Sequence, residues 1–339
     1  MPAISSGKVL VSGANGFIGA WVVRTLLEMG FAVRGAVRSI EKGAHLREIF
    51  AAYGDKLELI VVADITQEGA FDEAVKGVDA IEHMASPVHF SAVEPEEVIA
   101  PTVKGVLGML HSALKHRTSV KRVVLTSSTG AILQDEAQPK TFSELDWNEQ
   151  ALQQVAKMGS ATPGHTKYRA AKTLAERTAW EFVEQHKNEI GWDLVVLNPP
   201  FVFGPTIHAT PSPDALNLSA REFYKVFTQP SFPATLEKSG NCWVDVRDLA
   251  RAHALALLNE PAGGERIIIS AGPFVWQDWL DAAPDSSKYQ KGVAGTGKDA
   301  VHMVRYDVRK SARVLGITAY RSMAETARDT VADWEARSW

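Results

Sequence analysis

The chain has 339 residues, of which 45% are hydrophobic and 22% charged, and its net charge of −4 excludes the strongly basic surface typical of nucleic-acid-binding proteins. A single cysteine, Cys242, excludes an internal disulfide and is typical of a reducing compartment. Residues 1–7 show no basic and then apolar signal region, and no apolar run reaches the length of a membrane span. We therefore expect a cytoplasmic protein with no membrane or nucleic-acid partner, either a monomer or a homodimer.

The first 38 residues predict a strand, a glycine turn, a helix and a second strand. Residues 8–11 are an apolar run of strand length, apolar residues recur at helical spacing over 18–29, and residues 31–37 resume a strand pattern. Such a unit places a helix N-terminus at the end of the first strand, where free N–H groups and the positive end of the helix dipole attract phosphate.

The turn between that strand and that helix carries three glycines at intervals of three, Gly13, Gly16 and Gly19. Glycine allows a tight turn, a close approach of the backbone to a pyrophosphate, and close packing of the helix on the sheet. The spacing G-x-x-G-x-x-G differs from the more common G-x-G-x-x-G, so the string alone is a weak signal. Together with the surrounding strands and helix it predicts a dinucleotide site, for which the candidates are Gly13, Asn15, Gly16, Phe17, Ile18 and Gly19.

The end of the second strand indicates which dinucleotide binds. Folds that bind NAD usually place Asp or Glu there to bond the ribose 2′-hydroxyl. This chain has Arg38 at that point, with Lys42 four residues further on. Two cations suit a 2′-phosphate, so we predict NADPH as the cofactor. The alternative is that both are ordinary solvated surface cations.

The rest of the chain continues the alternation of strands and helices. Strands are predicted at residues 57–62, 78–84, 121–128, 194–197 and 265–270, and helices at 40–53, 66–75, 95–117, 165–186, 220–227, 245–259 and 323–339. The alternation predicts an α/β fold with a doubly wound parallel sheet, the Rossmann fold, and a smaller C-terminal lobe for the substrate. The nucleotide domain is predicted to span 1–200 and about 241–270, and the lobe about 201–240 and 271–339.

Several candidate residues follow the ends of the predicted strands, where ligands of open α/β sheets bind. Asp64 follows the third strand and is expected either to contact adenine or to cap the helix over 66–75. The fourth strand runs into Ala85 and Ser86, and the fifth ends in hydroxyls, of which Ser128 is placed to hold a substrate oxygen.

Tyr168 and Lys172 are the candidate chemical pair. They are four residues apart on a predicted helix, so the phenol and the ammonium share one face. A nearby cation favours the phenolate and lowers the tyrosine pKa, which would ease proton exchange with an alcohol or a ketone. The string Y-x-x-x-K alone is common, but here it follows a strand that ends in Ser-Ser. The ten histidines show no H-E-x-x-H or comparable spacing, so we expect no metal site.

Taken together, these strings resemble those of the extended short-chain dehydrogenases/reductases, in the branch that holds dihydroflavonol reductases and fungal carbonyl, aldehyde and methylglyoxal reductases. The resemblance covers nearly the whole chain and includes residues 13–19, 33–38, 125–128, 198–205 and 244–248 besides the tyrosine and the lysine. It implies an NADPH-dependent reductase that transfers hydride to a ketone or aldehyde carbonyl and yields an alcohol.

The resemblance also implies roles for individual residues. Tyr168 would donate the proton, Lys172 would bind the nicotinamide ribose and lower the tyrosine pKa, and Ser128 would bond the carbonyl oxygen, with Thr126 and Ser127 as runners-up. The remaining implied cofactor contacts are Arg38 and Lys42 at the 2′-phosphate, Asp64 and Ile65 at the adenine, Ala85 and Ser86 beyond the fourth strand, and Pro199 and Val202 beside the nicotinamide.

One departure from the family pattern and two rival functions complete the interpretation. Plant dihydroflavonol reductases read flavonoid hydroxyls with an Asn or Asp shortly after the serine, where this chain has Ile132, Leu133 and Gln134. We therefore expect less polar ketones or aldehydes. The candidate pocket walls are Phe90, Phe201, Phe203 and Trp243, and the alternative for each is a plain core aromatic. The rival functions are a sugar-nucleotide epimerase or dehydratase that retains NAD, and a non-catalytic protein that senses NADP.

Overall fold

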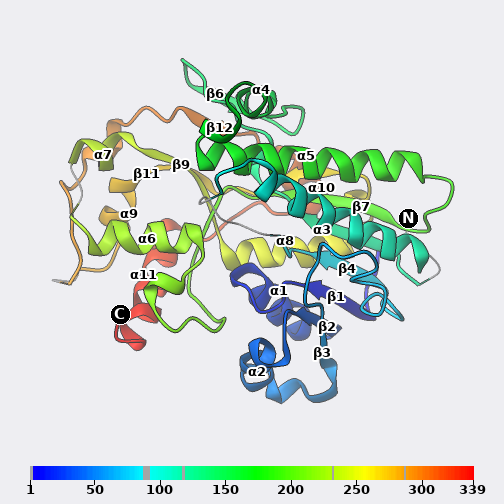
Figure 1. Ribbon diagram of the computed structural model, residues 1–339. Helices are drawn as coiled ribbons and strands as arrows, with labels where there is room; N and C mark the ends of the chain where they lie inside the picture. The colour runs from blue at the N-terminus through cyan, green and yellow to red at the C-terminus, as the bar shows by residue number, and fades with distance from the viewer. Residues whose placement is uncertain (1–2, 87–91, 117–118, 231–232, 286–287) are drawn as a thin grey trace.

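The computed structural model of the chain describes residues 3–86, 92–116, 119–230, 233–285 and 288–339. Within these residues a seven-stranded parallel sheet forms the centre of the molecule, in the order β10-β7-β5-β4-β1-β2-β3 (Figure 1). Its strands are β1 (Lys8–Ser12), β2 (Ala32–Val37), β3 (Leu57–Val61), β4 (Ala80–His83), β5 (Arg122–Thr126), β7 (Asp193–Asn198) and β10 (Arg266–Ile268). The predicted doubly wound fold is confirmed. The order reverses between β1 and β4, and such a switch point is where open α/β sheets bind ligands.

Helices cover both faces of this sheet because its strands are apolar on both sides. Val9 and Val11 of β1 pack in one core with α1 (Phe17–Glu28) and α8 (Val246–Leu258), which lie against each other. Leu10 points the other way, into a second core with α3 (Glu96–Lys115) and α5 (Gly164–Gln185), which are also neighbours (Figure 1). The period-two alternation along a strand thus supplies both cores from one short sequence. Two further helices on the first face are α2 (Ile40–Ile49) and α10 (Arg309–Leu315).

The C-terminal part forms a smaller layer beside the sheet, at the left of Figure 1. Its strands are β8 (Phe201–Phe203), β9 (Gly240–Asp245) and β11 (Gly272–Val275), and its helices are α6 (Leu218–Thr228), α7 (Pro233–Lys238), α9 (Trp276–Ala282) and α11 (Met323–Ala336). An aromatic core holds it together, in which Phe203 stacks on Phe223 at 4.6 Å and Trp243 packs edge-on to Trp279 at 4.6 Å between ring centroids. The division into a nucleotide domain and a substrate lobe stays a prediction. Strand β9 nevertheless pairs with β8 and β11 rather than with the central sheet.

One predicted helix is absent from the structure, and one pair of short strands was not predicted. Residues 66–75 do not form a helix but a series of turns, in which Gly69 has φ +69° and so interrupts any right-handed helix. A small parallel pair, β6 (Lys140–Phe142) with β12 (Val304–Tyr306), was not predicted, because three residues are too few for a periodic signal. A short helix, α4 (Glu149–Met158), lies between β6 and α5. No helix among the described residues is both long and apolar enough to cross a membrane.

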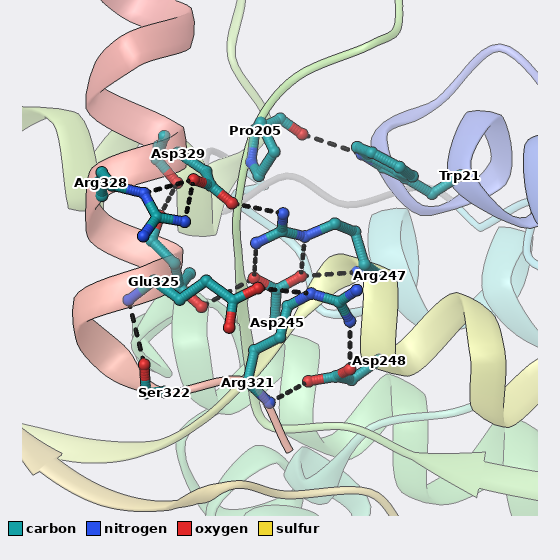
Figure 2. Close-up of polar contacts among 12 residues, drawn as sticks. Trp21, Pro205, Asp245, Arg247, Asp248, Arg321, Ser322, Glu325, Arg328 and Asp329 are labelled. Carbon is teal, nitrogen blue, oxygen red and sulfur yellow. Dashed lines mark hydrogen bonds and ion pairs between the residues drawn. The ribbon is translucent and has the colours of Figure 1, made fainter.

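A network of charged residues joins α11 to the start of α8 (Figure 2). Asp245 is fully buried, and its Oδ1 accepts a hydrogen bond from the backbone N–H of Arg247 at 2.8 Å, which caps α8. Its Oδ2 accepts from the Arg247 guanidinium at 2.8 Å and from the Thr326 hydroxyl at 2.7 Å. Arg247 also reaches Asp329 of α11 at 2.6 Å. These bonds fix the last helix of the lobe against the helix that covers the central sheet.

We expect Thr326→Val to lower the free energy of unfolding by about 2 kcal/mol, because it removes a hydrogen bond to a buried carboxylate without changing the side-chain volume much. The matched control is Thr330→Val on the same helix, which loses only a bond to the Thr326 carbonyl and should cost less than about 1 kcal/mol. Urea unfolding of both variants measures the difference. Equal losses would show that the Thr326–Asp245 contact does not stabilise the joint.

Candidate active site

The glycine turn closes tightly on the first turn of α1. Gly13 has φ +67°, in the left-handed region, and a Cβ on it would lie 3.2 Å from the backbone nitrogen of Ala85 after β4. A Cβ on Gly19 would lie 2.1 Å from the carbonyl oxygen of Gly13. Glycine is therefore required at both positions for the helix to begin this close to the strand end. The result is a backbone cradle at the switch point between β1 and β4, which fits a pyrophosphate.

The two predicted phosphate ligands lie beside this cradle. Arg38 follows β2 directly, Lys42 lies in the first turn of α2, and both side chains are exposed. The Asn15 side chain of the glycine turn donates to the Lys42 carbonyl at 3.3 Å, so the structure brings the turn and the start of α2 together. Neither cation has an acidic partner in the part of the chain that the structure describes. Both are therefore free to meet an added anion.

Four of the remaining cofactor candidates are Asp64 and Ile65, which contact neighbouring protein residues, and Ala85 and Ser86, which lie near Lys172. Asp64 accepts bonds from the backbone and hydroxyl of Thr66 at 2.9 and 2.7 Å, which lower the pKa of its carboxyl, so it holds a turn instead of capping a helix. Ile65 packs against Gly105 of α3. Ala85 and Ser86, by contrast, lie where β4 ends, and the Ser86 hydroxyl accepts a bond from Lys172 Nζ at 3.3 Å.

Ser128, Tyr168 and Lys172 meet at the carboxyl edge of the sheet. Helix α5 carries the tyrosine and the lysine one turn apart, and Ser128 is the second residue after the end of β5. Gly130 lies between Ser128 and Tyr168, since a Cβ on it would lie 3.3 Å from Ser128 Oγ and 3.5 Å from the tyrosine ring. Ser127 points elsewhere, to the Glu176 carboxylate, as strand alternation predicts. The three side chains border one cavity of about 800 Å³.

The pKa of Tyr168 differs from the expectation in its direction. Loss of hydration raises the pKa of Tyr168 above its usual value, with a hydrogen bond to Ser128 acting in the opposite direction. The expected lowering of the tyrosine pKa by Lys172 is therefore not found, and burial sets the direction of the shift. Burial also lowers the pKa of Lys172 to about 8, while Glu176 acts to raise it. At pH 7 the lysine is mostly charged and the tyrosine keeps its proton.

The residues that bond to the buried face of α5 were not predicted from the sequence. Glu176, one turn after Lys172 and fully buried, accepts bonds from Ser127, from Asn198 at 2.7 Å, and from Arg266 of β10. Arg266 also donates to the carbonyls of Glu144 and Asp146 and stacks over Trp147 at 3.6 Å from the ring centroid. A glutamate on the buried face of a predicted helix, four residues from the lysine, was the available signal.

The cavity extends from the glycine turn to the lobe. Its inner end is bordered by Gly13, Gly16, Phe17, Ile18, Gly19, Ser86, Pro199 and Val202. Its outer end is bordered by Leu133, His165, Arg169, Phe201, Asn217, Leu218, Ser219, Glu222 and Asn241. Of the predicted walls, Phe201 borders the cavity, whereas Phe203 and Trp243 belong to the buried aromatic core and Phe90 lies outside the described residues. Asn15, Arg38, Lys42, Asp64, Ile65 and Ala85 do not border it.

A doubly wound parallel sheet with a glycine cradle at its switch point defines a Rossmann-type dinucleotide-binding protein. Residues 9–272 match the model of the NAD dependent epimerase/dehydratase family, and the chain belongs to this family. The expected membership of the extended short-chain dehydrogenases/reductases is thereby confirmed.

Two relatives and one solved structure show where in the family the chain lies. It is 34% identical over 338 residues to the NADPH-dependent methylglyoxal reductase GRE2 of Saccharomyces cerevisiae, with 95% of this chain and 96% of the relative covered. It is 39% identical over 279 residues, 80% of each chain, to an uncharacterised oxidoreductase of Schizosaccharomyces pombe. The crystal structure of yeast methylglyoxal/isovaleraldehyde reductase Gre2 complexed with NADPH superposes with a TM-score of 0.85 at 31% identity, covering 97% and 99% of the two chains.

Proposed function

We propose that the protein is an NADPH-dependent reductase that converts a ketone or aldehyde into an alcohol. The observation that carries the proposal is the convergence of Ser128, Tyr168 and Lys172 on a cavity that runs from the glycine cradle to the lobe. The relatives that are named reductases support the same activity.

Tyr168, Ser128 and Lys172 each have a separate role in the proposed reaction. When bound, NADPH supplies the hydride for the carbonyl carbon. Tyr168 gives its proton to the carbonyl oxygen, and since its pKa is raised, it is protonated before the reaction. Ser128 donates a hydrogen bond to the same oxygen, so negative charge is neutralised as it forms. Lys172, charged and held by Ser86, orients the nicotinamide ribose and stabilises the phenolate that remains.

The residues of the cavity wall indicate which carbonyl compounds fit the cavity. Leu133 borders the cavity at the position where plant relatives are expected to read flavonoid hydroxyls, while Gln134 turns away and donates to the Trp147 carbonyl at 3.2 Å. Phe201 and Leu218 add apolar surface on the lobe side. These walls favour ketones and aldehydes with apolar substituents. The test is a screen of α-ketoesters, aryl ketones, diketones and aldehydes for consumption of NADPH.

The rival function is a sugar-nucleotide epimerase or dehydratase, which returns the borrowed hydride and keeps its NAD. Arg38 opposes it, because a cation replaces the carboxylate that would bond the ribose 2′-hydroxyl. The two functions differ in stoichiometry. A reductase oxidises one NADPH for each alcohol formed, whereas the rival enzyme is purified with NAD and shows no net oxidation.

Arg38→Ala is expected to raise the Kd for NADPH about 10-fold to 100-fold and to leave the Kd for NADH within about twofold, because only the former loses a charge-assisted bond to phosphate. Arg47→Ala, an exposed cation at the other end of α2, is the matched control and should change neither value. Titration of intrinsic fluorescence gives both constants. An unchanged ratio of the two would assign the phosphate to other residues.

A further inference from the structure

A second, much smaller chamber lies beside Lys172, which borders both this chamber and the large cavity. Its volume is about 10 Å³, enough for one water molecule. It is bordered by His83 at the end of β4, Thr102 of α3, and Lys172 and Glu176 of α5, among others. Polar side chains from three elements thus border it together with the apolar residues Ala85, Val106, Leu125 and Ala175. A buried site with several polar partners holds ordered water.

The hydrogen bonds around His83 fix its tautomer. The Ser12 hydroxyl, at the end of β1, accepts bonds from the backbone N–H groups of Met84 at 2.9 Å and Ala85 at 3.0 Å. Both lone pairs of that oxygen are thus used, so its own hydrogen points to His83 Nδ1 at 2.9 Å. Because Nδ1 accepts, the proton of the neutral ring is on Nε2.

This Nε2–H group is fully buried and has no hydrogen-bond partner among the described residues. His83 also packs at right angles to the ring of Phe71, at 5.6 Å between centroids, and it borders the chamber. Burial and the nearby Lys172 charge lower the pKa of His83 to about 3, so the ring stays neutral at working pH. A buried donor without a partner destabilises the folded state, and a single acceptor in the chamber removes that cost.

Lys172 needs an acceptor in the same place. Its ammonium has three hydrogens, and the Ser86 hydroxyl at 3.3 Å is its one acceptor in the described part of the chain. Lys172 and His83 are both donors, so they cannot bond each other. Acceptors on the chamber's other walls are the Glu176 carboxylate and the Thr102 hydroxyl, whose own hydrogen goes to the Val98 carbonyl at 2.7 Å.

We propose that one ordered water in this chamber accepts hydrogen bonds from His83 Nε2 and Lys172 Nζ and donates to Glu176 and Thr102, and that His83 is through it a positioning residue for Lys172. These hydrogen bonds connect Ser12, next to the glycine turn, through His83 and the water to the ammonium of Lys172. The effect on turnover rests on the function proposed above, whereas the tautomer and the water do not.

Two substitutions at His83 separate positioning from folding. In His83→Asn an amide oxygen can replace Nδ1 as the acceptor for Ser12, but nothing replaces Nε2–H. In His83→Gln an amide N–H can replace Nε2–H, but the Ser12 bond is lost. We expect kcat to fall about tenfold in His83→Asn with KM for NADPH within about twofold, and we expect His83→Gln to retain more of kcat although it is the less stable protein. If kcat instead follows the unfolding temperature, or is unchanged in His83→Asn, the proposal is wrong.

The control is His253→Asn. His253 of α8 is also fully buried, bonded to Thr126 at 3.1 Å and to Glu82 at 2.6 Å, but it does not border the chamber. It should lower stability and leave kcat of the folded enzyme within about twofold.

Two measurements on the unmodified protein do not depend on activity. Nitrogen-15 NMR of the histidine side chains should show His83 as the neutral Nε2–H tautomer between pH 5 and 8, and a high-resolution crystal structure should show the water. An Nδ1–H tautomer, a charged ring or a chamber without water would overturn the proposal. Since neither measurement uses a substrate, their failure is distinct from failure of the proposed reductase activity.

Discussion

Tyr168→Phe is expected to lower kcat for carbonyl reduction by about 10²-fold to 10⁴-fold, the range typical of losing a general acid. The substitution removes only the hydroxyl, so the Kd for NADPH and the unfolding temperature should change little. Steady-state kinetics with the best substrate of the screen measures the loss.

The matched control is Tyr320→Phe, which removes a hydroxyl bonded to Ser311 at 3.2 Å, away from the cavity. Its activity should stay within about twofold of the unmodified protein. If Tyr168→Phe and Tyr320→Phe behave alike, the tyrosine is not the proton donor, and the non-catalytic NADP-sensing function becomes the better hypothesis.

Glu176→Gln is expected to lower the free energy of unfolding by about 3–5 kcal/mol, because it leaves the buried guanidinium of Arg266 without its counter-charge. Glu176 is fully buried and Arg266 is 7% exposed, so water cannot replace the missing charge. Urea unfolding followed by circular dichroism measures the change. The surface pair of Arg177 and Glu149, where Glu149 has half of its side chain exposed, is the control, and Glu149→Gln should cost less than about 1 kcal/mol.

The double variant Glu176→Gln with Arg266→Met separates the ion pair from other contacts of Glu176. Removing both charges should cost less than the sum of the two single substitutions by about 1–3 kcal/mol. Purely additive losses would mean that Glu176 stabilises the fold through Ser127 and Asn198 and not through Arg266.

The fold could be predicted where the apolar periodicity agrees with the residues that end helices and strands. The first unit, over residues 8–37, has a continuous apolar strand, a helical repeat and a glycine stop, and each element lies within a few residues of its predicted range. The turns at 66–75 were misread because Gly69, with φ +69°, outweighs the apolar spacing around it. The β6–β12 pair joins segments from distant parts of the chain, and neither carries enough residues to show a pattern.

The residues of the candidate site could also be predicted only in part. Tyr168 and Lys172 were found from helical spacing, and the glycines from a turn that no other residue fits. The partners of Glu176 could not be found, since Arg266 and Asn198 come from other strands and a buried ion pair looks like surface charge in sequence. His83 was missed because its role depends on which nitrogen carries the proton, and only the bonds to Ser12 decide that.

The central claim is that hydride passes from NADPH to a carbonyl carbon in the cavity beside Tyr168. The most direct test is to supply NADPH carrying deuterium at both C4 positions of the nicotinamide and to analyse the product by mass spectrometry. We predict one deuterium on the carbinol carbon for each NADPH oxidised. An unlabelled product, or a protein that holds NAD and oxidises no NADPH with any carbonyl compound of the screen, would contradict the account.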